Sequence, residues 1–538
     1  MRVTYLVNNV KKSTKKSNED VDLLDFHRQN RHTGKIRAKK DITLISCDHY
    51  LPFRVNHKDL YFLNGYQSWT DTKEFMLSKR LRNIKKSPHL ITHKFAMDKY
   101  GDSSFYKYSI NKSHGYDIFY SKGEFESFIY SLNSKNAYLI IELKKIQKYL
   151  HLIGEVKNVK LNQGDEFTLL DYRFFTSYEE GVEGFNQDFP LLNKEKIFGY
   201  TSWYNYYQDI NEEIILRDLS ALDSRFNVFQ IDDGYETFVG DWLDVDEKKF
   251  PNGLLPIVKK IHQKNLKAGI WLAPFAVESK SKLFKEHPDW LVRNEKGKPL
   301  TTGGNWSGFY SLDIYNEEAR NYIRKVLTHY MDMGFDFFKL DFLYAAALYP
   351  VSGKSRCQVQ RESYEFLREI LKDKIILGCG ANIINSYQVF DYLRIGPDVS
   401  LRFDDVPYMR MFHRERISTK VTLQNTIYRH IFDQRLFGND PDVFLLRDNN
   451  IELFKEQRES LTKINALFGS VLMTSDNIAE YDEDKKAVLE QALELFYKGK
   501  VLKIETVKNL IYIDYDVNGT FHHDVYNTEK GILVHDAI

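Results

Sequence analysis

The first residues in this sequence whose types and spacing could do chemistry are Lys339 and Asp341. They lie in the run Phe-Phe-Lys-Leu-Asp-Phe at 337–342, which is short, apolar and aromatic, as a buried strand is. Because they are two residues apart, both side chains would project from the same side of that strand. A charge pair in such a strand is costly to bury. It is therefore either a functional pair or a structural ion pair at the strand end.

Polar and aromatic residues follow other predicted strands in the same way. We expect strands at 197–203, 227–232, 267–273, 335–341, 375–379, 391–396, 443–447 and 469–474. In a barrel of parallel strands these ends would meet on one face. The residues that would gather there with Lys339 and Asp341 are Trp203, Tyr204, Asp232, Asp233, Trp271, Cys379, Arg394 and Asp398.

This set of side chains indicates carbohydrate chemistry. Tryptophan rings offer flat apolar faces to the C–H face of a sugar ring. Carboxylates, lysine and arginine form charge-assisted hydrogen bonds to hydroxyl groups. Two separate carboxylates can act as nucleophile and proton donor in glycosidic bond cleavage. No histidine is prominent at the predicted strand ends, which weighs against a zinc site there.

Each of these residues also has a structural interpretation when taken alone. Asp232 and Asp233 precede Gly234 and are typical of an Asx turn with a helix cap. Arg394 is equally typical of a structural salt bridge. Cys379 by itself indicates a small buried apolar residue, and Trp271 indicates core packing. The functional interpretation depends on their joint placement at strand ends.

The elements that must position these residues change along the chain. Residues 1–190 are rich in short strands and turn signals such as Asn-Gln-Gly-Asp at 162–165, which predicts an N-terminal β-sandwich domain. Residues 191–498 alternate strands with helical patterns at 212–223, 254–265, 317–333 and 358–373. This alternation predicts an α/β fold, a catalytic (β/α)8 barrel. Short strands return at 499–538 and predict a small C-terminal β domain.

Composition excludes several classes of protein. The net charge of +1 gives no overall field for nucleic acid or membranes, and no Gly-x-Gly-x-x-Gly turn or P-loop is present. No run approaches the roughly 20 apolar residues of a membrane span, and the N-terminus carries no signal-peptide pattern. The three cysteines, Cys47, Cys357 and Cys379, have no metal-type spacing and favour a reducing compartment. We expect a cytoplasmic protein with no nucleic-acid or membrane partner.

Several of these segments together resemble glycoside hydrolase family 36, the melibiase-type α-galactosidases. The resemblance covers about residues 60 to 480, and its motifs occur in order. Asn-Gly-Tyr-Gln-Ser-Trp at 64–69 is similar to that family's Asn-Gly-Trp-Gln-Ser-Trp. The other segments are Trp203-Tyr204, Ile-Asp-Asp-Gly-Tyr at 231–235, Lys-Leu-Asp at 339–341, Leu-Gly-Cys-Gly at 377–380, Arg-Ile-Gly-Pro-Asp at 394–398 and Asn-Asp-Pro-Asp at 439–442.

The resemblance implies a retaining α-galactosidase that acts on α-galactoside oligosaccharides without a metal or organic cofactor. Asp341 would be the nucleophile and Asp398 the general acid and base. The substrate-binding residues that it implies fall into three groups. Asp232, Asp233 and Lys339 would bind the O3, O4 and O6 side of galactose; Cys379 and Arg394 would lie near O2; and Trp69, Trp203, Tyr204 and Trp271 would wall the sugar.

The sequence also departs from the family pattern. Tyr66 replaces the first tryptophan of the N-terminal motif, the C-terminal β domain is short, and the loop at 399–403 differs. Asp404 and Asp405 are further candidates for the acid/base, but Asp398 keeps the family spacing from Arg394 and directly follows a strand.

Rival interpretations remain open. They are an α-N-acetylgalactosaminidase of the same fold, a metal-dependent barrel hydrolase, and a non-catalytic sugar-binding protein. The sequence does not determine the oligomeric state.

Overall fold

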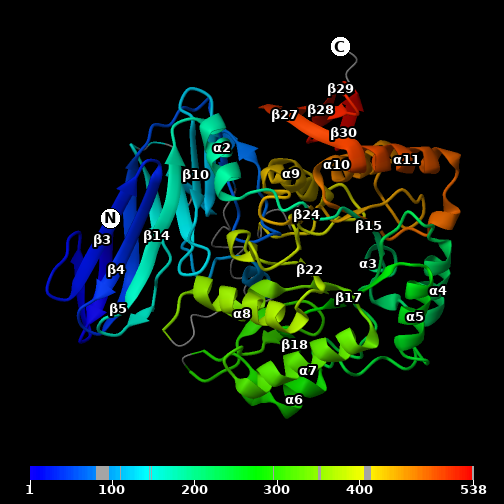
Figure 1. Cartoon of the computed structure of the whole chain (residues 1–538), viewed down its shortest axis with the longest axis horizontal. Helices are drawn as coiled ribbons and strands as arrows, with labels where there is room; N and C mark the ends of the chain where they lie inside the picture. Colours follow the sequence, from blue (N-terminus) through cyan, green and yellow to red (C-terminus); the bar gives the residue numbers. More distant parts are fainter. Residues whose placement is uncertain are drawn as a thin grey trace.

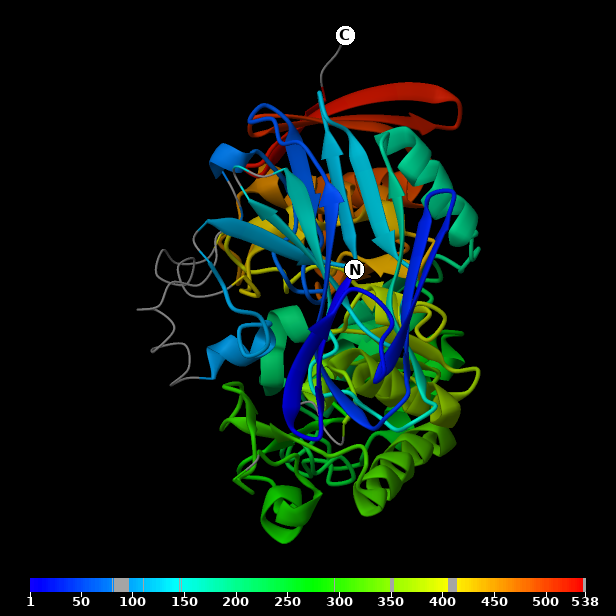
Figure 2. The same cartoon turned by 90° about the vertical axis from the view of Figure 1, so that its left-hand side faces the viewer.

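The computed structural model describes residues 1–79, 81, 96–109, 111–144, 146, 148–294, 296–348, 353–404 and 414–535. Figure 1 shows antiparallel strands of the N-terminal region at the left and parallel strands with their helices at the right. A small antiparallel sheet lies above the parallel strands. Figure 2, seen from the left-hand side, shows the N-terminal strands in front of the rest of the chain. The N-terminal strands therefore lie beside the parallel strands.

Two antiparallel seven-stranded sheets make up the N-terminal region. Burial alternates along strands such as β1 and β4, and the inward side chains of both sheets share one apolar core. The first sheet contains β1 (Arg2–Val7), β2 (Val10–Thr14), β5 (Ile42–Pro52), β8 (Lys112–Tyr116), β11 (Leu139–Lys144), β12 (Tyr149–Gly154) and β13 (Lys160–Leu161). The second contains β3 (Val21–Arg28), β4 (Arg31–Ala38), β6 (Leu60–Leu63), β7 (Glu74–Phe75), β9 (Ile118–Lys122), β10 (Ser127–Ser131) and β14 (Glu166–Phe175).

A parallel sheet of nine strand segments follows, in the order β24-β23-β22-β21-β17-β16-β15-β26-β25. β24 and β25, at the two ends of this order, are separated in the chain by Pro441 and Asp442 alone. The segments are β15 (Ile197–Thr201), β16 (Val228–Ile231), β17 (Lys267–Leu272), β21 (Phe337–Leu340), β22 (Ile375–Gly378), β23 (Tyr392–Arg394), β24 (Gly438–Asp440), β25 (Val443–Phe444) and β26 (Val471–Thr474). The coarse prediction, a parallel α/β sheet beside antiparallel sheets, is confirmed.

Helices connect these strands and a three-stranded antiparallel sheet is inserted after β17. The helices are α2 (Tyr178–Asp188), α3 (Trp203–Tyr206), α4 (Glu212–Ala221), α5 (Leu255–Gln263), α6 (Lys282–Glu286), α7 (Glu317–Met333), α8 (Arg356–Leu371), α9 (Thr419–Tyr428), α10 (Lys455–Phe468) and α11 (Glu483–Lys498). The inserted strands are β18 (Ala276–Glu278), β19 (Thr301–Gly303) and β20 (Phe309–Ser311). No helix among the described residues is long and apolar enough to span a membrane.

The helix α7 shows why the sequence pattern located these elements well. The Asn316 side chain accepts a hydrogen bond from the Ala319 N–H at the N-terminus of the helix. Gly334, with a left-handed φ of 105°, ends it. The buried stripe includes Ile323, Leu327 and Tyr330, at helical spacing. The observed bounds are those that the sequence predicted.

One predicted strand, at 443–447, differs from the structure. The chain instead forms two short segments, β24 and β25, that hydrogen-bond to different neighbours. Pro441 has no N–H to donate to a strand partner. Asp442 has a φ of 82°, which breaks the extended conformation.

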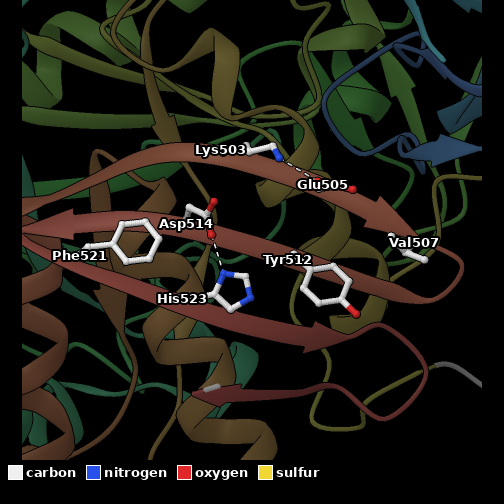
Figure 3. A pocket seen from close by; sticks show the side chains of 7 residues that line it. All are labelled: Lys503, Glu505, Val507, Tyr512, Asp514, Phe521 and His523. Carbon is white, nitrogen blue, oxygen red and sulfur yellow. Dashed lines mark hydrogen bonds and ion pairs between the residues drawn. The ribbon is translucent and has the colours of Figure 1, made fainter. Parts of the chain in front are cut away.

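The chain ends in a four-stranded antiparallel sheet of β27 (Gly499–Val507), β28 (Leu510–Val517), β29 (Thr520–Asn527) and β30 (Ile532–His535). Its inner face buries Ile511, Ile513 and Tyr515 in the large core cluster. The outer face carries a shallow groove, shown in Figure 3, which includes Tyr512 and Phe521 and the His523–Asp514 hydrogen bond. None of the predicted active-site residues lines this groove.

Candidate active site

The ends of neighbouring parallel strands bring the predicted polar residues together. β16 ends directly before Asp232, and β21 ends directly before Asp341. β23 ends at Arg394, four residues before Asp398. Because these strands are parallel and follow one another in the sheet, their carboxyl ends lie along one edge.

Lys339 and Asp232 form a buried ion pair at this edge. Lys339 Nζ donates to Asp232 Oδ2 at 2.9 Å, and the two side chains are 5% and 2% exposed. The same carboxylate oxygen accepts hydrogen bonds from Gln230 Nε2 at 2.6 Å and Thr201 Oγ1 at 3.0 Å. Burial lowers the pKa of Lys339, but the negative groups around it, Asp232 first and then Asp341, together outweigh burial and the pKa is raised. Lys339 therefore stays charged at neutral pH.

The carboxylate of Asp341 is held through both of its oxygens. Trp271 Nε1 donates to Oδ2 at 3.0 Å, and the Phe342 N–H donates to Oδ1 at 2.7 Å. The two hydrogen bonds fix the orientation of the carboxylate. Phe342 has a left-handed φ of 52°, a strained conformation for an aromatic residue. Backbone strain thus occurs beside the best-oriented carboxylate of the site.

Arg394 lies among three carboxylates. Its Nε donates to Asp440 Oδ2 at 2.9 Å, and its Nη1 donates to Asp398 Oδ1 at 3.0 Å. Its Nη2 forms an ion pair with Asp442 Oδ1 at 2.7 Å. Asp442 also accepts hydrogen bonds from the Tyr204 hydroxyl and from the Val399 N–H at the base of the Asp398 loop. Arg394 is therefore a structural ion-pair partner and also a contact of Asp398.

Asp398 is partly open to solvent. Its side chain is 33% exposed, against 3% for the neighbouring Arg394. Desolvation by the surrounding site raises the pKa of Asp398, and Arg394 and Lys339 oppose that effect. The Asp341 carboxylate adds to the increase, and the pKa is raised overall. A raised pKa is what a carboxyl needs in order to donate a proton near neutral pH.

Asp233 lies on the other side of the Asp232 pair. Trp306 Nε1 donates to Asp233 Oδ2 at 3.0 Å, and Gln208 Nε2 donates to both carboxylate oxygens at 3.1 and 3.2 Å. Desolvation raises the pKa values of Asp233 and of the buried Glu236. The two carboxyl groups also interact with each other. Asp233 is thus fixed by neutral donors, in contrast to Asp232.

Aromatic rings surround these carboxylates. Trp271 lies 5.7 Å from Trp242 and 6.2 Å from Trp306, centroid to centroid, in edge-to-face contacts. Trp69 lies 5.2 Å from Phe342 in the same geometry. Trp203 is half-buried and stacks edge-on against Tyr207 at 5.1 Å. Such rings can form the walls of a sugar site.

The segment 64–69 reaches the site from the N-terminal region. Trp69 Nε1 donates to the Cys379 sulfur at 3.2 Å, so both residues are fixed by one contact between regions. Ser68 Oγ accepts from the N–H groups of Gly380 and Ala381 at 3.0 and 3.3 Å. The buried Arg429 donates to the Ser68 carbonyl at 2.5 Å. Trp69 is therefore held in place by contacts from both regions.

The structure brings all the predicted site residues to this edge, although Tyr204 and Cys379 are almost completely buried. Asp404 accepts a hydrogen bond from Ser418 Oγ at the start of α9, and Asp405 lies outside the described residues. Sequence reasoning missed Trp306, Gln208 and Asp442 as partners of the site. Of these, only Asp442 lies in a segment that resembles the family, Asn-Asp-Pro-Asp at 439–442. Its place in that segment could have identified it as a partner of the site.

Comparisons with known proteins agree with this geometry. A sequence model of the Melibiase family matches residues 191–371, which contain Asp232, Lys339 and Asp341. The resemblance to glycoside hydrolase family 36 is confirmed. Alpha-galactosidase Mel36A of Lactobacillus acidophilus is 29% identical over 192 residues, which are 32% of this chain and 25% of that protein. Alpha-galactosidase 1 of Pediococcus pentosaceus is 32% identical over 139 residues, 24% of this chain and 18% of that protein.

A solved structure extends the similarity of fold beyond this family segment. TtGalA, an α-galactosidase from Thermus thermophilus solved with p-nitrophenyl α-D-galactopyranoside, superposes with a TM-score of 0.71 at 22% identity. The superposition covers 93% of this chain and 98% of that one. The sequence matches, in contrast, span 25% and 18% of the lengths of the two curated relatives named above. The family model matches the part of the chain that contains β15, β16, β17 and β21.

Proposed function

We propose that this chain is a retaining α-galactosidase that hydrolyses terminal α-D-galactosyl residues of galacto-oligosaccharides. The observation that carries the proposal is the strand-end pair of Asp341 and Asp398. Asp341 is oriented by two N–H donors, and Asp398 is partly exposed and has a raised pKa. The α-galactosides bound to the structural relative support the substrate class.

In the first half of the reaction, protonated Asp398 gives its proton to the glycosidic oxygen as the leaving group departs. Asp341 attacks C1 from the β face through an oxocarbenium-like transition state and forms a β-galactosyl ester. Lys339, charged and close to both carboxyls, would donate hydrogen bonds to O3 and O4 and so hold the sugar in place. A separation of about 5–5.5 Å between the two carboxyls is what a retaining route requires.

In the second half, Asp398 acts as a base toward water. Ester formation neutralises Asp341, and this removes one of the causes that raise the pKa of Asp398. The cations Arg394 and Lys339 then favour ionised Asp398, which deprotonates the water that attacks C1. The electrostatics of the site thus switch the role of Asp398 between the two steps, and α-galactose is released.

The remaining residues would recognise galactose. Asp232, Asp233 and Lys339 would bind the O3, O4 and O6 side, where the axial 4-OH distinguishes galactose from glucose. An ammonium group has three donors, and the Asp232 contact uses one of the donors of Lys339. Cys379 and Arg394 would lie near O2. The wall would consist of Trp69, Trp203, Tyr204 and Trp271.

We propose that the parallel strands close into a (β/α)8 barrel through the chain segment 438–444. The support is that β24 pairs with β23 and β25 with β26, although only two residues separate β24 from β25. The division into a sandwich at 1–190, a barrel at 191–498 and a C-terminal β domain at 499–538 is part of the same proposal. A cytoplasmic location stays a prediction.

An α-N-acetylgalactosaminidase of the same fold is the nearest alternative. Its substrate would need space and an amide partner at C2. Cys379 is buried against Trp69, and Arg394 is engaged by carboxylates, which supports a site for a smaller hydroxyl group. Relative rates on the aryl α-galactoside and the aryl α-N-acetylgalactosaminide distinguish the two.

Two rivals of other classes are tested more simply. A metal-dependent hydrolase would use the aspartates as ligands, but Lys339 and Arg394 already pair with Asp232 and Asp398. Full activity after EDTA treatment argues against it. A non-catalytic sugar-binding protein would bind galactosides without turnover.

The decisive experiment is stereochemical. Nuclear magnetic resonance of the reaction on 4-nitrophenyl α-galactoside should show α-galactose before mutarotation; β-galactose as the first product would refute the retaining assignment. Asp341→Gly with azide should yield β-galactosyl azide, because azide fills the space of the missing nucleophile. Asp398→Ala with azide should yield α-galactosyl azide, because the ester still forms on Asp341. If Asp404→Ala gives the α-azide and Asp398→Ala behaves like wild type, the acid/base assignment is wrong.

A further inference from the structure

A cluster of metal-ligating side chains lies outside the candidate active site, on the hairpin of β3 and β4. His27 and His32 face each other across this hairpin, and Asp25 precedes His27 by two residues on the same face. One potential ligand atom from each of the three residues lies within 4.8 Å of the other two. In Figure 1 the hairpin lies at the outer side of the N-terminal region, away from the parallel strands.

One pair of ligand atoms in the cluster has the separation found around a bound ion, and the rings of His27 and His32 are stacked with centroids 4.3 Å apart. His27 Nε2 lies 3.4 Å from Asp25 Oδ1, and His32 Nε2 contacts the same oxygen. Zinc binds histidine nitrogen and carboxylate oxygen at about 2.0–2.2 Å in tetrahedral geometry. Two ligand atoms of such a site are therefore about 3.4 Å apart. The His27–Asp25 separation already has that value. A modest opening of the His32–Asp25 contact would admit the ion.

The surroundings hold His32 in place. His32 is only 4% exposed, and its ring is packed between His49 of the opposite sheet, at 4.7 Å between centroids, and Tyr172 of the adjacent strand, at 5.1 Å. The Nδ1 atoms of His32 and His49 are buried and have no hydrogen-bond partner among the described residues. Each of these two histidines therefore has one ring nitrogen that forms no hydrogen bond to a described residue. A ligand fixed by packing loses little freedom when it binds a metal.

The cluster is also accessible. The side chains of His27 and Asp25 are 65% and 39% exposed, so an ion can enter from solvent at the open rim of the two sheets. The tight turn at 29–30 sets the strand register and so keeps His27 opposite His32. We propose that Asp25, His27 and His32 form a Zn²⁺ site with a fourth position open to water, which fastens the outer hairpin of the N-terminal region. The site is separate from the proposed catalytic chemistry.

The test uses the full chain without an affinity tag, stripped of metal and titrated with Zn²⁺ by calorimetry and with Co²⁺ by visible absorption. We expect one equivalent of Zn²⁺ to bind, a tetrahedral Co²⁺ spectrum, and a melting temperature that rises with Zn²⁺. His27→Ala should weaken binding at least about tenfold, because only two ligands remain, and Asp25→Asn should weaken it too. His27 is largely exposed, so its replacement should leave the fold intact.

A matched control is His523→Ala. His523 also contacts an aspartate, Asp514, through a ring nitrogen, but its pair belongs to no group of three ligands among the described residues. This variant should bind Zn²⁺ as the wild type does. Absence of a stoichiometric site in the wild type, or equal binding by the His27→Ala variant, would overturn the proposal. Hydrolytic activity should be the same in wild type and His27→Ala.

Discussion

Replacing Lys339 by methionine tests how the buried ion pair supports both the fold and the site. Lys339→Met keeps the length of the side chain and leaves Asp232 without its cation. Breaking a buried pair costs about 3–5 kcal/mol, because the remaining charge is left uncompensated. Asp232 keeps hydrogen bonds from Gln230 and Thr201, so the low end of that range applies. We expect the free energy of unfolding to fall by about 3 kcal/mol.

The chain offers a matched control in Lys354 and Glu362. Lys354 Nζ donates to both carboxylate oxygens at 2.7 Å, but the two side chains are 36% and 38% exposed. Exposed pairs contribute about 0.2–1 kcal/mol, so Lys354→Met should lower the free energy of unfolding by no more than that. Urea denaturation of both variants, analysed with unchanged slope, measures the difference.

The double variant Lys339→Met with Asp232→Asn adds a second measurement. It removes both charges, so it should recover part of the stability that Lys339→Met loses, and together with the single variant Asp232→Asn it completes a double-mutant cycle that gives the coupling of the pair. On 4-nitrophenyl α-galactoside, Lys339→Met and Asp232→Ala should each lose at least about 2–3 kcal/mol in kcat/KM, because a sugar hydroxyl and a buried partner are left unpaired. Equal loss of stability in Lys339→Met and Lys354→Met would refute the reasoning.

Three further outcomes are expected. Burial raises the pKa of Asp117 from 3.8 to about 7, so the ionisation of this carboxyl lowers the free energy of unfolding as the pH rises through that range. Asp117→Asn should therefore be more stable than wild type near pH 8, by up to about 4 kcal/mol. The gain in melting temperature should vanish near pH 4. Trp69→Ala should raise KM although its segment comes from the N-terminal region, and an unchanged KM with the fold intact would remove Trp69 from the pocket wall. Trp306→Phe should lower kcat/KM about tenfold, since Asp233 loses a donor, whereas Trp290→Phe, outside the site, should not.

Local patterns predicted the helices and strands wherever they agree with the final packing. The helix at 317–333 carries its own start and stop signals in Asn316 and Gly334, so its bounds could be read from the sequence. The strand near 443 could not, because its form depends on Pro441 and on the left-handed Asp442. Asp442 forms an ion pair with Arg394, which lies on another strand, and a local sequence pattern does not show such a contact.

The candidate site was predictable to the same extent. Asp232, Lys339 and Asp341 stand next to apolar runs, where the strand pattern makes them visible. Trp306 lies in the connection between β19 and β20, far along the chain from Asp233, and no periodicity links the two. Trp69 was found only through the family resemblance, since nothing local in 64–69 indicates a contact with Cys379.

The contacts made by segment 64–69 also bear on how this protein could be recombined with its relatives. Arg429, which follows α9, donates to the Ser68 carbonyl and to Asn64 Oδ1, while Gly380 and Ala381 bind the Ser68 hydroxyl. A chimera whose crossover falls between the N-terminal strands and the parallel sheet would join surfaces that had not changed together, and a partner without an equivalent of Asn64 would deprive the buried Arg429 of a side-chain acceptor. Such a crossover would break the pocket even where each half folds well. The N-terminal strands and the parallel sheet should therefore be taken from the same parent protein. Exchanges that aim at a new specificity should replace the loops after the parallel strands, together with segment 64–69.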